Sequence, residues 1–296
     1  MRCPIFILFF FLYSITNACA IDNATADSIG VLPRGTTHFD IYRGNIILDG
    51  ILNDTVSIKA LLDTGAWGIA VPVKYKTSKE PESDIWPPKD KEHFRVGDCE
   101  QNAIATYTTE QSQFLKWFKG ECVLLGWDFF EGKILEISYS GKYIRILDRK
   151  NLQNLKGYDC VNFKEKGKRL LIPVLIVVQE KKIEGDCWID TGLNGSLFFT
   201  HNIPALYSLD TGKSRLGTAK GLDQKASKLN VLMADSISIG HNSITHRDVL
   251  FTDEAWSVFK ENDMYIGLIG NQFFHDFSII FDFQEKKLYM RPERGN

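Results

Sequence analysis

Short apolar runs separated by polar and glycine-containing turns occupy most of this chain. Near the start, Ile46–Leu48 and Ile51–Leu52 flank Asp49–Gly50, and Asn53–Asp54 precedes Val56. Apolar runs of this length, bounded by Asp, Asn and Gly, are typical of β-strands joined by tight turns. The pattern predicts short strands here, with turns at Asp49–Gly50 and Asn53–Asp54.

The second half of the chain shows the same pattern. Residues 171–180 (LIPVLIVVQE) and 181–190 (KKIEGDCWID) predict a hairpin, and alternation over residues 236–240 predicts a further strand. The C-terminal SIIFDFQEKKLYMRP reads as strand, polar turn and strand. Helix signals are sparse; the best are residues 253–261 and the Phe-rich segments after Gly126 and Gly270. The chain is therefore predicted to be all-β with few short helices.

The apolar pattern is duplicated along the chain. SIKALLDTGAWGIAVP (57–72) matches EGDCWIDTGLNGSLFF (184–199), and LLGWDFF (124–130) begins a segment that matches the one begun by LIGNQFF (268–274). The offsets are 190 − 63 = 127 and 270 − 126 = 144, so the second copy carries 144 − 127 = 17 extra residues within 200–265. Self-similarity in a fixed order indicates repeated structural units. We predict two tandem lobes, over residues 38–152 and 153–296.

Composition narrows the function without identifying it. The 296 residues carry 35 basic and 37 acidic side chains, with no basic cluster of the kind that binds nucleic acid. The six His residues are scattered and no CxxC spacing occurs, so no metal site is predicted.

The first twenty residues, MRCPIFILFFFLYSITNACA, have the features of a signal peptide. Arg2 supplies the positive charge, an apolar run follows, and Ala18-Cys19-Ala20 is a small-residue cleavage site. The apolar run is too short for a membrane span, which needs about 20 residues. We expect cleavage after Ala20 and a polar linker over 21–37; the alternative is a lipid anchor on Cys19. Either way, the protein is predicted to be exported, to the periplasm or outside the cell.

Export would allow the remaining cysteines to form disulfides. Cys99, Cys122, Cys160 and Cys187 remain after cleavage, and an oxidising compartment permits disulfides. Pairing Cys99 with Cys122 and Cys160 with Cys187 would keep each bridge local. The alternative is a buried free thiol at Cys187, which lies in an apolar run.

The matched Asp-Thr-Gly triplets, at residues 63–65 and 190–192, carry the candidate chemistry. One such triplet is ordinary turn chemistry. Two copies, each followed by an apolar-apolar-Gly element that ends at Gly126 or Gly270, resemble the retropepsin/pepsin-like aspartic peptidases. The second copy, with its terminal hairpin, resembles the exported retropepsin-like proteases of bacteria. The resemblance covers nearly all of residues 38–292.

The resemblance implies two β-barrel lobes related by a pseudo-twofold axis, with one active site between them. Asp63 and Asp190 would share a proton and activate a water molecule for hydrolysis of a peptide bond, with no cofactor and no metal. The substrate would be a polypeptide. A single chain would be sufficient as a monomer, although pairing of each lobe with another chain stays open.

The resemblance also assigns supporting roles. Thr64 and Thr191 would hydrogen-bond across the interface, and Gly65 and Gly192 would allow backbone amides to approach the carboxylates. Gly126 and Gly270 would pack against the two loops.

Two features depart from the family pattern. Ala66 follows the first triplet, as in retropepsins, but Leu193 follows the second, where Ala, Ser or Thr is usual. Neither residue supplies the hydroxyl found there in pepsin-like members. The regions that should carry a flap match poorly: we expect it at residues 213–229, with Gly217 and Gly221, in the second lobe and near Gly97 in the first. These departures motivate the alternative function, a catalytically inactive peptide-binding or structural protein that keeps the fold.

Overall fold

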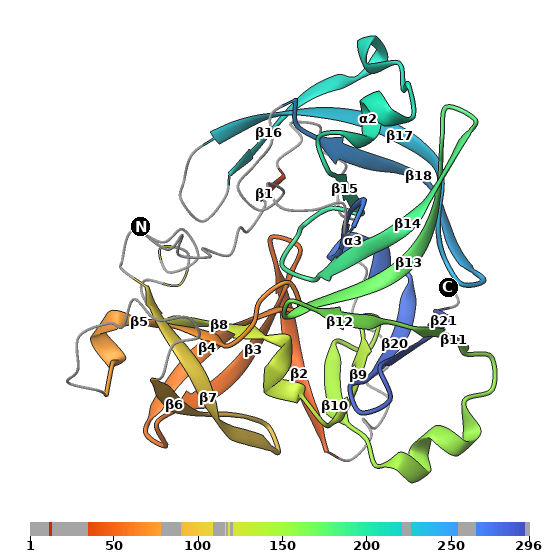
Figure 1. The fold of residues 1–296 in the computed structure, drawn as a ribbon. Coiled ribbons are helices and arrows are strands. Elements are labelled where there is room, and N and C mark those ends of the chain that lie inside the picture. The colour runs from red at the N-terminus through yellow and green to blue at the C-terminus, as the bar shows by residue number, and fades with distance from the viewer. Residues whose placement is uncertain are drawn as a thin grey trace, which may run out of the picture.

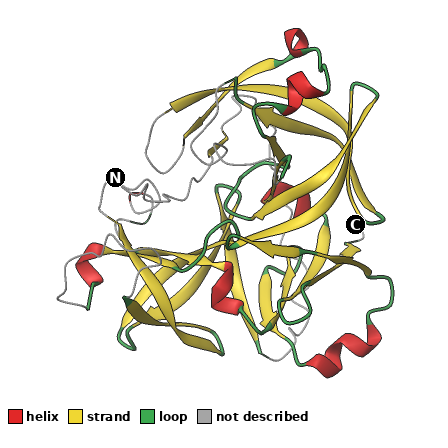
Figure 2. Cartoon of the chain, in the orientation of Figure 1, coloured by secondary structure: helices red, strands yellow, loops and turns green. Residues whose placement is uncertain are grey.

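The computed structural model describes residues 35–77, 90–108, 121–220, 226–253 and 265–293, together with residues 12, 13, 116 and 118. Strands dominate this part of the chain (Figure 2), and no helix in it is long and apolar enough to cross a membrane. Its helices are η1 (Val73–Tyr75), η2 (Trp127–Phe130), η3 (Arg149–Asn154), α2 (Ile203–Leu206), η4 (Thr211–Lys213) and α3 (Asn271–Phe274). The predicted all-β class is confirmed.

A closed barrel of six strands forms the first lobe. Its strands are β3 (Asn45–Leu52), β4 (Val56–Asp63), β5 (Ile69–Pro72), β6 (Lys91–Val96), β7 (Cys99–Thr108) and β8 (Cys122–Gly126). They pair in the order β3–β4–β8–β5–β7–β6, and a pairing of β6 with β3 closes the ring. The pairs β4–β8 and β5–β7 are parallel, and the other pairs are antiparallel.

The second lobe repeats this ring strand for strand. Its strands are β13 (Arg169–Val178), β14 (Lys181–Asp190), β15 (Leu197–Phe199), β17 (Ala226–Ile239), β18 (Asn242–Phe251) and β19 (Gly267–Gly270). The order β13–β14–β19–β15–β18–β17 closes through β17 and β13, with β14–β19 and β15–β18 as the parallel pairs. The predicted duplication is therefore confirmed at the level of topology.

A sheet shared by both halves joins the barrels (Figure 1). It contains β2 (Thr36–Tyr42), β9 (Ile134–Ser138), β10 (Tyr143–Ile146), β11 (Asp159–Asn162), β20 (Phe277–Asp282) and β21 (Lys287–Pro292). At its centre β9 pairs antiparallel with β20, and Glu136 lies opposite Ile280. Because 136 + 144 = 280, these two residues are equivalent in the repeat. The pseudo-twofold axis therefore passes through this pair.

Three further strands extend the second barrel. β12 (Lys164–Lys166) pairs with β13, and β16 (Arg215–Lys220) forms a hairpin with β17. β1 (Leu12–Tyr13) lies along the outer edge of β16, opposite Lys220 and Ala219 (Figure 1). The outer edge of β16 can therefore take an extended segment as its neighbour.

Phenylalanine fills much of the core, which accounts for its frequency of 20 residues in the sequence. Most of the largest fully buried side chains are Phe residues, which include Phe94, Phe129, Phe130, Phe198, Phe199, Phe251, Phe273, Phe274 and Phe281. One continuous apolar cluster runs through both barrels and the shared sheet. The two lobes are thus fused through a common core.

The predicted turn at Asp49–Gly50 is wrong. β3 runs unbroken through both residues, which pair with Lys59 and Ile58 of β4. A Cβ at Gly50 would lie 2.5 Å from the Phe94 ring, so glycine is required there for close packing and makes no turn. The tight turn lies at Asn53–Asp54, where both φ angles are positive.

The predicted disulfides are absent: Cys99, Cys122, Cys160 and Cys187 are all free thiols. Cys99 packs in the main core, whereas Cys122 packs in a separate cluster on the outer face of the first barrel. Cys187 is fully buried and Cys160 is exposed on β11. The predicted partners lie in different environments, and the free-thiol alternative for Cys187 is correct.

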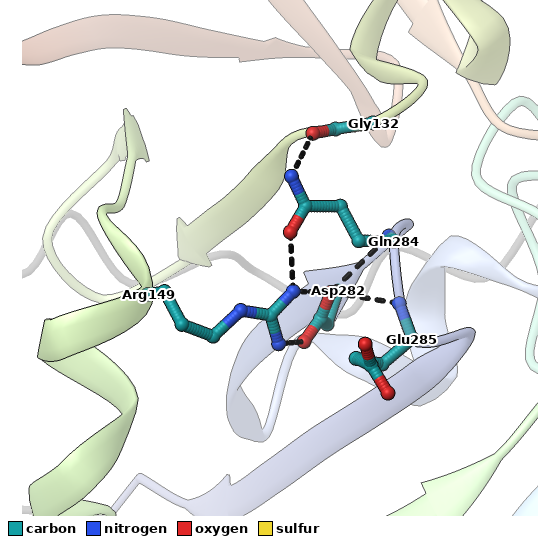
Figure 3. Close-up of polar contacts among 5 residues, drawn as sticks. All are labelled: Gly132, Arg149, Asp282, Gln284 and Glu285. Carbon is teal, nitrogen blue, oxygen red and sulfur yellow. Dashed lines mark hydrogen bonds and ion pairs between the residues drawn. The ribbon is translucent and has the colours of Figure 1, made fainter.

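A polar network ties the segment between the lobes to the C-terminal hairpin (Figure 3). The guanidinium of Arg149 pairs with Asp282, a fully buried carboxylate, and also donates to the side chain of Gln284. The same carboxylate accepts hydrogen bonds from the backbone N–H groups of Gln284 and Glu285, at 3.2 and 3.1 Å. Gln284 donates in turn to the carbonyl oxygen of Gly132, at 2.6 Å.

Candidate active site

The two Asp-Thr-Gly triplets occupy equivalent places at strand ends. Asp63 ends β4 and lies opposite Gly126 at the end of the parallel strand β8, and Asp190 lies in the same way opposite Gly270. A Cβ at Gly126 would come within 2.5 Å of the Gly68 carbonyl oxygen, and one at Gly270 within 2.2 Å of that of Gly195. Each glycine thus lets the loop after the Asp fold back against its neighbouring strand.

The two loops are joined by a symmetric set of hydrogen bonds. Thr64 N donates to Thr191 Oγ1, and Thr191 N donates to Thr64 Oγ1, both at 3.0 Å. The hydroxyls donate onward, from Thr64 to the Ile189 carbonyl at 3.2 Å and from Thr191 to the Leu62 carbonyl at 3.1 Å. Both threonines are buried, so these four bonds fix the two loops relative to each other.

This geometry brings Asp63 and Asp190 together across the interface. Both side chains are buried, and the two carboxyl groups lie close enough for each to shift the pKa of the other. A Cβ on Gly65 would lie 2.6 Å from Asp190 Cγ, and one on Gly192 would lie 2.7 Å from Asp63 Cγ. The two glycines therefore make room for the carboxyl group of the opposite lobe.

The surroundings of the two carboxyl groups favour a shared proton. Burial raises the pKa of Asp63 and of Asp190, and the negative charge of Asp63 raises the pKa of Asp190 further. Backbone hydrogen bonds oppose this shift, from Gly65 N to Asp63 Oδ1 at 2.8 Å and from Leu193 N to Asp190 Oδ1 at 3.0 Å. Because two carboxylates in contact repel each other, the pair takes up and releases protons as a unit.

Leu193 directly follows the second triplet, and its backbone N–H donates to Asp190 Oδ1. Its side chain is fully buried in a cluster on the outer face of the second barrel, where it contacts the backbone near Gly270. Ala66 holds the equivalent buried position in the first lobe. Neither residue supplies a hydroxyl to the carboxyl groups.

The sequence prediction missed a second pair of contacts between the lobes. Trp127 Nε1 donates to the carbonyl oxygen of Lys168 at 3.0 Å, and Asn271 Nδ2 donates to that of Gly44 at 2.5 Å. Since 127 + 144 = 271, the two donors are equivalent in the repeat, and each reaches a hairpin turn of the other half. The unequal side chains hid this symmetry, although the offset of 144 could have revealed it.

The hairpin of β16 and β17 is the element expected to carry the second flap. Residues 213–220 and 226–229 of that prediction lie in this hairpin or just before it, and Gly221 lies outside the described residues. Gly97, however, joins β6 to β7, and its counterpart is Gly240 between β17 and β18. The segment equivalent to the hairpin in the first lobe is 73–90, of which 78–89 lie outside the described residues. The topology therefore places the first flap region before Gly97.

No group of His, Cys, Asp and Glu residues able to hold a metal ion occurs in the described part of the chain. The described site consists of carboxyl groups, hydroxyls and backbone amides.

Comparison with known proteins gives matches among solved structures but none by sequence. No family model and no curated protein matches the sequence. Among solved structures, the chain is similar to the aspartic proteinase from Irpex lacteus, with 10% sequence identity and a TM-score of 0.48. The match covers 87% of this chain and 97% of that one.

Proposed function

We propose that this protein is an aspartic endopeptidase. The observation that carries the proposal is the meeting of the buried Asp63 and Asp190 carboxyl groups at the centre of a two-fold arrangement. Two buried carboxyl groups in contact cost stability, and a purely structural protein gains nothing from them. The clearance at Gly65 and Gly192 supports the proposal, because a Cβ at either position would collide with the carboxyl group of the opposite lobe.

The proposed mechanism follows from the shared proton. A water molecule held between the carboxyl groups loses a proton to the ionised one and attacks the carbonyl carbon of the peptide bond. The protonated carboxyl group hydrogen-bonds to the carbonyl oxygen as negative charge develops there. The C–N bond then breaks as the carboxyl group that took the proton from water passes it to the leaving amine. The hydrogen bonds between Thr64 and Thr191 keep the two groups in register, so little reorganisation accompanies the reaction.

The proposed substrate is an extended polypeptide. The outer edge of β16 pairs, at Lys220 and Ala219, with β1 of the predicted signal peptide, so removal of that peptide leaves this edge open to another extended segment. Edge-strand pairing of this kind binds a peptide through its backbone, largely independently of sequence. We infer that a substrate reaches the dyad as a strand added beside this hairpin.

The test is cleavage of casein across a range of pH by the wild type and by Asp63→Asn and Asp190→Asn. Each variant keeps the side-chain volume but removes one carboxyl group, so each should lose at least about a hundredfold in rate. Asp49→Asn, an exposed carboxylate on β3, serves as the control and should match the wild type. Equal background cleavage by the wild type and both dyad variants would contradict the proposal and favour the inactive peptide-binding alternative.

Two further parts of the proposal concern the state of the protein. We infer export, from the signal-peptide features of residues 1–20, and a monomer, because one chain supplies both carboxyl groups. Cell fractionation tests the first and sedimentation of the active species the second. Activity that appears only in a dimer would overturn the second.

A further inference from the structure

The face of the second barrel beside Asp190 carries an unusual group of aromatic and cationic side chains. Trp188 lies two residues before Asp190 on β14, so both side chains project from the same side of the strand. The intervening residues, Cys187 and Ile189, point into the main core, whereas Trp188 belongs to the outer cluster that also contains Leu268. Trp188 therefore lies on the surface of the barrel that leads to the dyad.

A guanidinium group covers this tryptophan. Arg169, the first residue of β13, places Cζ 4.8 Å from the centre of the Trp188 ring and 6.0 Å from that of Tyr265. The two rings meet edge to face, with centroids 5.9 Å apart. Stacking on aromatic faces fixes the plane of a guanidinium group, which prepares it for planar two-point recognition of a carboxylate.

Lys168, the residue before Arg169, adds a second cation, which contacts the active-site loop of the first lobe. The ammonium group of Lys168 lies over the ring of Trp67, 2.9 Å from its centre, and Trp67 follows Asp63 by four residues. The turn between β12 and β13 therefore brings positive charge next to both active-site loops.

An unpartnered donor marks the same place. Trp188 is only 8% exposed, yet its Nε1–H has no hydrogen-bond partner among the residues that the structure describes. A buried donor left unpaired costs free energy, so it points to an acceptor supplied from outside the chain.

The first barrel lacks this arrangement. The repeat places Leu61 where the second barrel has Trp188, since 61 + 127 = 188. The equivalent pairs Ile47–Leu61 and Leu171–Trp188 place Asn45 where the second barrel has Arg169. Asn45 is buried, and its Oδ1 has no donor. The site is thus asymmetric: the second-barrel side offers donors and positive charge, and the first-barrel side offers a neutral acceptor.

We propose that Arg169 and the indole N–H of Trp188 form a subsite that selects substrates with a glutamate or aspartate side chain. The acidic residue occupies one fixed position, on the second-barrel side of the cleaved bond. This inference rests on the proposed peptidase function, because it concerns the substrate of that activity. Peptide binding tests it without any need for cleavage. The carboxylate accepts from the guanidinium group and from Trp188 Nε1, which satisfies the buried donor.

The experiment uses a series of decapeptides with a central Phe-Leu pair, because apolar side chains such as Leu61, Leu193 and Leu268 flank the dyad. A single glutamate is moved along the series, and each peptide has a matched glutamine version. Affinity is measured by calorimetry with the Asp63→Asn chain, and cleavage with the otherwise unchanged chain. One position should favour glutamate by about tenfold, as expected for a charge-assisted hydrogen bond.

Three further variants decide the origin of that preference. Arg169→Gln should bring the glutamate-to-glutamine ratio close to one, and Trp188→Phe, which keeps the ring, should lower it by a smaller factor. Arg247→Gln, at an exposed arginine paired with Asp276, is the matched control and should leave the ratio unchanged.

The outcomes separate the subsite from the peptidase activity. No glutamate preference in binding at any position, or a preference that survives Arg169→Gln, overturns the subsite even if peptides are cleaved. A preference that depends on Arg169 in a chain that cleaves nothing supports the subsite and overturns the endopeptidase proposal.

Discussion

Thr191 shows how much of the site depends on single side chains. Its hydroxyl accepts from Thr64 N and donates to the Leu62 carbonyl, all in a buried environment. Thr191→Val keeps the shape but leaves both backbone groups unpaired. We expect a loss of about 2–4 kcal/mol in the free energy of unfolding, measured by urea denaturation.

The matched control is Thr191→Ser, which retains the hydroxyl and should cost less than about 1.5 kcal/mol. Equal losses in the two variants would show that the methyl group, rather than the hydrogen bonds, holds the loops together.

The dyad gives stability a defined dependence on pH. A carboxyl group whose pKa is higher in the folded than in the unfolded chain favours folding at low pH, and this contribution is lost as pH rises through the raised pKa. Because burial and the Asp63 charge raise the pKa of Asp190, the wild type should lose stability as pH rises above about 4.

Asp190→Asn removes this ionisation. Between pH 4 and pH 8 it should lose at least about 1.4 kcal/mol less than the wild type, as followed by denaturant midpoints. Burial also raises the pKa of Asp128, to about 6, but this group is common to both proteins and cancels in the comparison. Identical pH profiles would mean that Asp190 ionises at its ordinary pKa.

Individual site residues were predictable from the sequence where the two copies carry identical residues. Asp63 and Asp190, with the Thr and Gly residues that follow them, are identical in the two copies, and the structure brings all six together. The contacts of Trp127 and Asn271 escaped prediction because different side chains make the same hydrogen bond.

Among the elements, the two parallel strand pairs are the most constrained. Each active-site loop folds back against the glycine that ends the neighbouring strand, with no space for a methyl group. Gly270→Ala would place a Cβ 2.2 Å from the Gly195 carbonyl oxygen, so the loop or strand β19 must move. We expect the melting temperature to fall by several degrees, from a cost of roughly 1–3 kcal/mol, together with a large loss of the proposed peptidase activity.

Gly212→Ala provides the comparison, because its nearest neighbour is a flexible carboxylate 3.2 Å away in an exposed turn. This variant should be close to the wild type in both measurements. A similar melting temperature for the two variants would show that β19 or the loop at Gly195 can move to accommodate the added methyl group at little cost in stability.

Strand existence was predictable from apolar runs, but strand continuity was not. Gly50 resembled a turn residue because only the distant Phe94 explains its lack of a side chain. The position of the first flap region failed for a related reason. The turns at Gly97 and Gly240 are equivalent in the two barrels. Only the order of strands around each barrel shows that such a turn is not the flap hairpin, whose counterpart in the second lobe is β16 and β17.

For the whole molecule, the shared sheet and the network around Asp282 unite the two halves. Asp282→Ala removes the partner of Arg149 and the acceptor for two backbone N–H groups. We expect a loss of about 2–4 kcal/mol in the free energy of unfolding, because the carboxylate is fully buried. Unfolding followed by calorimetry should stay a single transition.

Asp49→Ala breaks a pair whose carboxylate is 82% exposed, and should cost no more than about 1 kcal/mol. If Asp282→Ala were equally mild, or split the melt into two transitions, the network would not couple the halves.

The fusion of the lobes through one sheet was beyond prediction from sequence. The duplication predicted two separate units, yet β20 and β21 pair with each other and β20 pairs with β9 from the first copy. Strand pairing over such separations leaves no local pattern, because the same apolar alternation would suit a sheet within either lobe.

The central pairing of β9 with β20 has a consequence for synthesis of the protein. Domains generally fold from the N-terminus as the chain emerges, but β9 has no neighbour on one side until β20 has been made, about 140 residues later. Asp63 likewise lacks its partner carboxyl group until Asp190 has been made and strands β14 and β19 of the second barrel have paired. Under the proposed mechanism a nascent chain is therefore inactive, and hydrolysis can begin only once both repeats have been translated.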